Sequence, residues 1–223
     1  RNTQDNLAAF KHFHGPDYKE ALHVIVKSDS APDIKNAILQ LKWLPDPSLE
    51  NVWPHNTVHE RWQGTLKNVQ RACILQSGLP VMMWNWTLPY AAIALGVSQF
   101  APILPNEKNE QGEVKPEFRK KSNWTCWQAH HGGKGFTGPM EPFGRLCFYH
   151  DKSRHSLEPQ ASPGLFVGWR LDSGCRYRGI CLIADYEKLR NGEFHTVRAL
   201  RKVPEKEIHF PSELTFPFAQ ARI

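Results

Sequence analysis

The sequence predicts an α/β domain followed by a small domain made of β-strands. The first half combines one β-branched run with amphipathic segments of helical length. The second half alternates short apolar runs with turns that contain Gly, Pro and Asp. Of the 223 residues, 40% are hydrophobic and 22% are charged, so the chain can bury a core and is not a disordered tail.

The formal net charge is +6, which fits a polyphosphate partner but is also common among ordinary globular proteins. The five cysteines are odd in number and have no paired spacing, which indicates reduced thiols and an intracellular protein. The longest apolar stretch, 79–104, is interrupted by Asn85, Pro89, Ser98 and Pro102. It therefore predicts buried helices, and no membrane association.

The first elements follow from local signals. Asp5 stands before helically spaced apolar residues, and the helix ends at Gly15. The β-branched run 21–27 predicts a buried strand that delivers Asp29 at its C-terminal end. A second helix over 32–41 and a proline-rich loop over 45–54 come next in the chain.

A long helix is predicted from the cap Asn56 to Ser77, closed by Gly78. One face of this helix is apolar and comprises Val58, Trp62, Leu66, Val69 and Cys73. Another face gathers Glu60, Gly64, Lys67 and Arg71 at helical spacing. The next helix, 84–97, is predicted to bend or break at its proline.

The second half predicts a small barrel or sandwich with short strands over 145–150, 165–171, 178–184, 196–203 and 207–210. The polar composition from Pro105 to Lys121 predicts a linker or surface insertion. The predicted division of the chain is 1–104, 105–140 and 141–213.

Two carboxylates form the first candidate site. Asp29 follows a strand and Glu60 stands in the first turn of a helix, so the pair could hold Mg²⁺ for phosphoryl transfer if the two ends converge. Lys67 and Arg71, on the face of Glu60, would then contact a DNA backbone. The alternative is that Asp29 is an ordinary turn residue and that Glu60 only interacts favourably with the helix dipole.

The motifs favour the first interpretation. "VIVKSDSAPD" (24–33) and "WPHNTVHERWQGTLKNVQRACILQSGLP" (53–80) resemble the integrase core of copia-type LTR retrotransposons. In that family a strand ends in the second catalytic Asp, and an Asn-Gly-Val-Ala-Glu-Arg-type helix start carries the catalytic Glu. "EPFGRLCFYHD" (141–151) and "LEPQASPGLFVGWRLDSGCRYRG" (157–179) are similar to the domain that follows the core in these Pol polyproteins.

The resemblance implies an RNase-H-like integrase core followed by a small Src-homology-3-like barrel. It assigns the catalytic and metal-ligating roles to Asp29 and Glu60, with Mg²⁺ or Mn²⁺ as the cofactor. The residues expected to contact DNA on the core are His55, Asn56, Arg61, Lys67 and Arg71. In the barrel, Arg170, Arg176 and Arg178 flank a turn and would grip phosphate, although a solvated hairpin is an equal alternative.

The chain also departs from the family pattern. Ser30, Ala31 and Pro32 stand where the family has Asn-Gly, and the spacing between Asp29 and Glu60 is slightly short. No upstream Asp has strand context, so the first strands of the core, with the first catalytic Asp, are expected to be missing. The fragment alone is therefore expected to be inactive, although it belongs by resemblance to the polynucleotidyl transferases.

The intact protein would process DNA 3′ ends and transfer them to target DNA, as a homo-oligomer acting in the nucleus. The first alternative is a catalytically dead, DNA-binding remnant of a transposable element. The second is a different RNase-H-like nuclease such as a resolvase. The barrel and the Ser77-Gly78-Leu79-Pro80 helix end speak against that nuclease.

Overall fold

A computed structural model gives the fold of the chain. The residues it describes are 2–19, 24–28, 31–47, 57–102, 121–151, 157, 159–194 and 199–220, with the backbone alone at 57–59, 102, 121 and 122. The chain divides into two compact units, which are described separately. The first unit comprises Arg1–Lys67 and Arg170–Ile180, and the second comprises Asn68–Trp169 and Cys181–Ile223.

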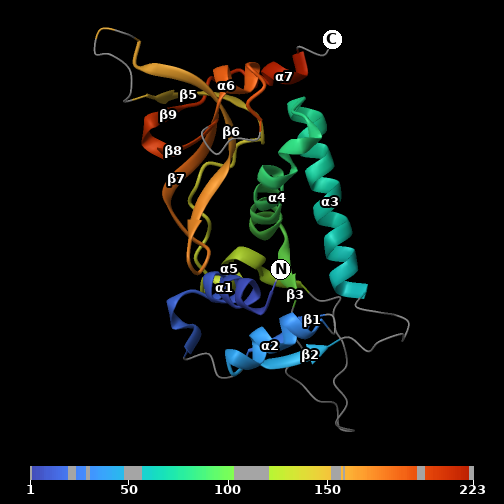
Figure 1. Ribbon diagram of the computed structural model, residues 1–223. Coiled ribbons are helices and arrows are strands. Elements are labelled where there is room, and N and C mark those ends of the chain that lie inside the picture. Colours follow the sequence, from blue (N-terminus) through green and yellow to red (C-terminus); the bar gives the residue numbers. More distant parts are fainter. Residues whose placement is uncertain are drawn as a thin grey trace. The chain divides into compact units, whose positions relative to one another are not determined.

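The first unit contains α1 (Thr3–His14), η1 (Pro16–Lys19), β1 (Ile25–Ser28), α2 (Pro32–Gln40), β2 (Leu44–Pro47) and the start of α3 (Thr57–Ser77) (Figure 1). The N-cap of α1 is Asn2, whose side chain accepts the N–H of Asp5 at 2.9 Å, so the predicted cap at Asp5 is wrong. Gly15 ends the helix as predicted, with φ of 99° and its N–H donated to Lys11 O.

Strands β1 and β2 are parallel and joined through α2, which makes a small βαβ unit. Pro45 and Pro47 lie within β2, where a loop was predicted; prolines are tolerated in a strand at the edge of a sheet. The predicted buried character of β1 is also wrong, because Ile25 is 66% exposed. Its other face is half-buried and includes Val26, which packs toward a small core of Ile38, Leu41 and Trp43.

The second unit contains the end of α3 and then η2 (Val81–Met83), α4 (Trp84–Ser98), β3 (Phe100–Pro102), β4 (Lys121–Thr125), α5 (Cys126–His130), β5 (Leu146–His150), β6 (Ala161–Asp172), β7 (Arg176–Asp185), α6 (Tyr186–Arg190), β8 (Leu200–Pro204), η4 (Glu205–Glu207), β9 (Ile208–His209) and α7 (Pro217–Gln220). The tips of β6 and β7 belong to the first unit. Helix α4 runs unbroken through Pro89, so of the two predicted alternatives the break is wrong, and the bend stays a prediction.

The five strands predicted for the second half are all present. They form a five-stranded antiparallel sheet in the order β8-β7-β6-β5-β9, in which the last strand returns to pair with β5. The mixed α/β class with a C-terminal β-sheet is thereby confirmed. The finer division at 105–140 stays a prediction. No helix in the described part of the chain combines the length and apolar character that a membrane span needs.

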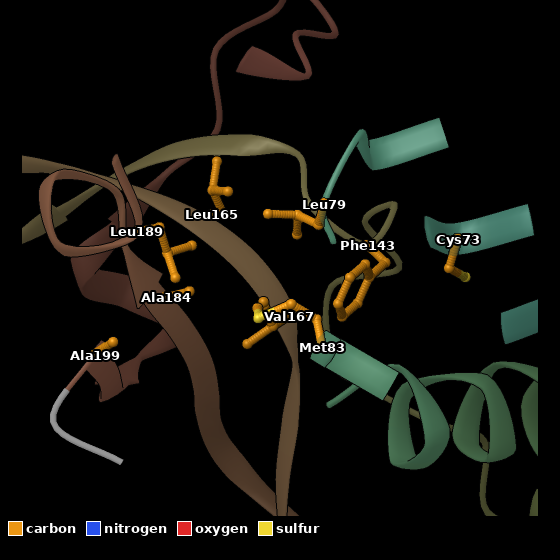
Figure 2. Close-up of a cluster of buried hydrophobic side chains, with 9 residues drawn as sticks. All are labelled: Cys73, Leu79, Met83, Phe143, Leu165, Val167, Ala184, Leu189 and Ala199. Carbon is orange, nitrogen blue, oxygen red and sulfur yellow. The ribbon is translucent and has the colours of Figure 1, made fainter. Parts of the chain in front are cut away.

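The core of the second unit is shared between its helices and its sheet. Figure 2 shows nine buried side chains that meet there: Cys73, Leu79, Met83, Phe143, Leu165, Val167, Ala184, Leu189 and Ala199. Leu79, directly after α3, is fully buried. Two glycines with positive φ allow close approach at the end of α3: a Cβ on Gly78 would lie 2.3 Å from Ala219 N, and one on Gly144 would lie 2.3 Å from Ser77 Cβ. The turn after α3 therefore anchors the helix to the sheet.

Candidate functional site

The predicted catalytic pair is described at one of its two positions. Strand β1 ends at Ser28, and Asp29 follows it but lies outside the described residues, as do His55 and Asn56. Glu60 lies in the first turn of α3 and is exposed. The convergence of Asp29 with Glu60 therefore stays a prediction.

The predicted polar face of α3 is exposed along its length. Glu60, Gly64, Lys67 and Arg71 are all exposed, and so is Arg61. Arg71 donates a long hydrogen bond of 3.4 Å to Asn68 Oδ1. The predicted apolar face is buried only in part: Cys73 is buried and Leu66 and Val69 are half-buried, but Trp62 is 39% exposed.

The carboxylate of Glu60 has no cation one turn along its own helix. The side chains that could pair with it stand at i+3 and i+4 on a helix, and these positions hold Gln63 and Gly64. Within the described ranges no group of three or more His, Cys, Asp and Glu residues gathers to hold a metal. An exposed carboxylate is a suitable oxygen ligand for Mg²⁺ or Mn²⁺, so Glu60 fits the expected cofactor as one ligand.

The predicted phosphate-gripping arginines occur on the β6–β7 hairpin, in the first unit. Arg178 Nε lies 3.1 Å from Asp172 Oδ2, and Arg170 Nε lies 3.8 Å from Asp172 Oδ1. Arg176 Nη2 lies 3.9 Å from Asp17 Oδ2. The three arginine side chains are 49% to 68% exposed, so this end of the hairpin faces solvent while its arginines pair with carboxylates.

The turn of this hairpin contacts the C-terminal end of α1. The backbone N–H of Gly174 donates to His12 O at 2.8 Å, and Ser173 Oγ donates to the same oxygen at 3.4 Å. His12 lies in the last turn of α1, where carbonyl groups lack helical partners, so the turn caps this helix end from a distant part of the sequence. Gly15 and Gly174 pack so closely that a Cβ on Gly15 would lie 3.0 Å from Gly174 Cα.

Sequence reasoning missed this contact. The sequence predicts only a helix end at Gly15 and a turn between Arg170 and Arg176. Nothing in a periodicity links positions about 160 residues apart, because long-range pairing leaves no local pattern. The positive φ angles at Gly15 and Gly174 are the features that a sequence could have signalled.

Three of the five cysteines are structural thiols. Burial raises the pKa of Cys73 to about 11 and that of Cys147 to about 12, and it also raises the pKa of Cys175. These thiols are therefore protonated at neutral pH and are poor nucleophiles. His131 stacks on Trp127 with 4.1 Å between the ring centroids.

Comparison with known proteins assigns the chain to no family. No family model matches the sequence, and no curated protein matches it. A chain in the cryo-EM structure of the simian T-cell lymphotropic virus intasome in complex with PP2A regulatory subunit B56 gamma is distantly similar, with 14% sequence identity and a TM-score of 0.37. The match covers 97% of this chain and 66% of that chain, so the present chain spans about two thirds of its length. This similarity assigns no residue a role.

Proposed function

We propose that the chain is part of an integrase that joins DNA ends, with an RNase-H-like core and a Src-homology-3-like barrel. The observation that carries this proposal is the agreement between motif order and element order. The first strand of the parallel βαβ unit formed by β1, α2 and β2 ends directly before Asp29, and Glu60 lies in the first turn of α3, which begins at Thr57. Carboxyl ends of parallel strands are where α/β folds place their ligands.

The sheet of the second half supports the barrel. The last strand of this region, β9, pairs with the first, β5, and β6, β7 and β8 then follow in chain order across the sheet. A 3₁₀ turn, η4, precedes β9. Return of the last strand to the first is what a small barrel needs in order to protect its edges. The five strands predicted from the alternation of apolar runs and turns are the five strands of this sheet, which supports the family resemblance of the second half.

In the proposed reaction, Asp29 and Glu60 would hold Mg²⁺ or Mn²⁺. Such an ion supplies charge stabilisation and an activated oxygen nucleophile for phosphoryl transfer. Glu60 would contribute a carboxylate oxygen from the start of α3. Lys67, about two turns further along the same face, would hold a backbone phosphate in position, and Arg71 would extend that contact. The protein's contribution is thus positioning and charge, with little covalent chemistry.

The proposed partners are the DNA ends of the element and the target DNA. The intact protein would work as a homo-oligomer in the nucleus, as the resemblance implies. His55, Asn56 and Arg61 would lie near the same DNA, because they flank the start of α3 in the sequence. Arg170, Arg176 and Arg178 would contribute a second set of phosphate contacts from the barrel.

Replacing Lys67 or Arg71 by glutamine is expected to weaken duplex DNA binding severalfold. Each change should also lower the slope of log affinity against log salt by about one, because one phosphate contact releases about one counterion. Fluorescence anisotropy with labelled duplex DNA over a range of salt concentrations measures both quantities.

Lys35→Gln is the matched control for this experiment, because Lys35 is an exposed lysine on α2 and carries the same charge. It should leave affinity and slope close to those of the unchanged chain. An equal loss of DNA affinity from Lys35→Gln would mean that DNA binding depends on net charge alone and that α3 is not the interface.

A further inference from the structure

The β6–β7 hairpin holds a carboxylate between two arginines. Asp172 presents one oxygen to Arg178 Nε at 3.1 Å and the other to Arg170 Nε at 3.8 Å. Two guanidinium groups on opposite oxygens of one anion are also the arrangement that arginines adopt around a phosphate. The hairpin therefore contains an anion site that the chain fills with its own side chain.

A second carboxylate is held nearby in the same unit. Asp17, in η1, lies 3.9 Å from Arg176 Nη2. It is kept opposite the hairpin because the turn is fixed to the end of α1 by Gly174 N–H and by the close packing of Gly15 on Gly174. The three hairpin arginines are thus each paired with an aspartate, although the two aspartates come from different parts of the sequence.

A more highly charged anion can displace the aspartates from these ion pairs. The side chain of Asp17 is 72% exposed and that of Arg178 is 68% exposed, and ion pairs between such solvated groups stabilise a protein only weakly. A DNA backbone presents many phosphates at high charge density and gains entropy by releasing counterions when arginines bind. A phosphate would accordingly compete well for the same guanidinium groups.

We propose that Asp172 and Asp17 occupy the hairpin arginines in the free chain as substitutes for phosphate, and that DNA displaces them. This inference rests on the proposed function, since it takes DNA as the ligand. It adds two positioning residues that hold the guanidinium groups in place before DNA arrives. It also sets a cost on hairpin binding, because each phosphate contact must first break an internal ion pair.

The test is DNA binding by the whole chain carrying Asp172→Asn or Asp17→Asn. Each variant frees arginine for phosphate, so affinity for labelled duplex DNA should rise roughly two- to fivefold and the salt slope should steepen by about one. Glu187→Gln is the matched control, because Glu187 is an exposed carboxylate that pairs with Arg190 at 3.9 Å on α6. It should change affinity much less than the two aspartate variants.

A double variant separates site chemistry from net charge. In an Arg178→Gln background the gain from Asp172→Asn should shrink, since one of the two arginines it frees is gone. Equal gains from Glu187→Gln, or no gain from both aspartate variants while circular dichroism shows them folded, would overturn the inference. Loss of the Lys67 and Arg71 effects in the same assay would instead count against the proposed α3 interface, so the two failures are distinguishable. If the unchanged chain binds no DNA, both the displacement of the aspartates and the α3 interface are contradicted.

Discussion

Replacing Leu79 by alanine is expected to lower the free energy of unfolding by about 3 kcal/mol. Leu79 is fully buried where the end of α3 meets the sheet, among Leu165, Val167 and Phe143 (Figure 2). The substitution loses the transfer free energy of the removed carbons and leaves a cavity in a core that packs from two sides. Urea unfolding followed by tryptophan fluorescence measures the loss, because the chain has eight tryptophans.

Leu75→Ala provides the comparison, from the last turn of the helix that precedes Leu79. Leu75 is 76% exposed, so its truncation should change the free energy of unfolding by less than about 0.5 kcal/mol. Equal losses at the two positions would contradict the anchoring of α3 to the sheet through Leu79.

Gly78→Ala is expected to cost about 3 kcal/mol or more. Its φ of 70° is strained for alanine, at about 1 kcal/mol or slightly above, and the added Cβ would lie 2.3 Å from Ala219 N and 2.4 Å from Phe218 C. Both neighbours are backbone atoms, so the contact cannot be relieved by turning a side chain. Thermal unfolding of the variant should show a correspondingly large fall in Tm.

Gly132→Ala separates conformational strain from the clash. Gly132 has a similar φ of 59°, but a Cβ there would meet nothing within 4 Å among the described atoms. The free energy of unfolding of this variant should fall only by the backbone strain energy, about 1 kcal/mol. If Gly78→Ala costs no more than Gly132→Ala, the close packing of the segment after α3 against α7 is wrong.

The local elements were largely predictable from the sequence. The five strands of the second half follow from short apolar runs between turns, and α3 follows from its 3.6-residue period and the Gly78 stop. Strand β2 was missed because Pro45 and Pro47 signal a loop, whereas its pairing with β1 depends on a strand earlier in the chain. The exposed Ile25 was missed because a β-branched run looks the same at an uncovered face as in a core.

The candidate site divides in the same way. The exposed face of Glu60, Gly64 and Lys67 was predictable, because positions on one helix face follow from spacing alone. The carboxylates that hold the hairpin arginines were not. Asp17 contacts Arg176 only because the hairpin turn caps α1, and that contact is a property of tertiary packing.

The most direct test of the central claim is DNA joining dependent on Mn²⁺. The chain would be joined to the upstream core strands that the family resemblance implies, and the transfer of a labelled DNA 3′ end to target DNA would be measured. The proposed function predicts joining that Glu60→Gln abolishes, that Asp29→Asn abolishes, and that the surface control Glu187→Gln leaves intact. Absence of joining from the unchanged protein, with salt-dependent DNA binding preserved, would contradict the integrase assignment and identify a DNA-binding remnant.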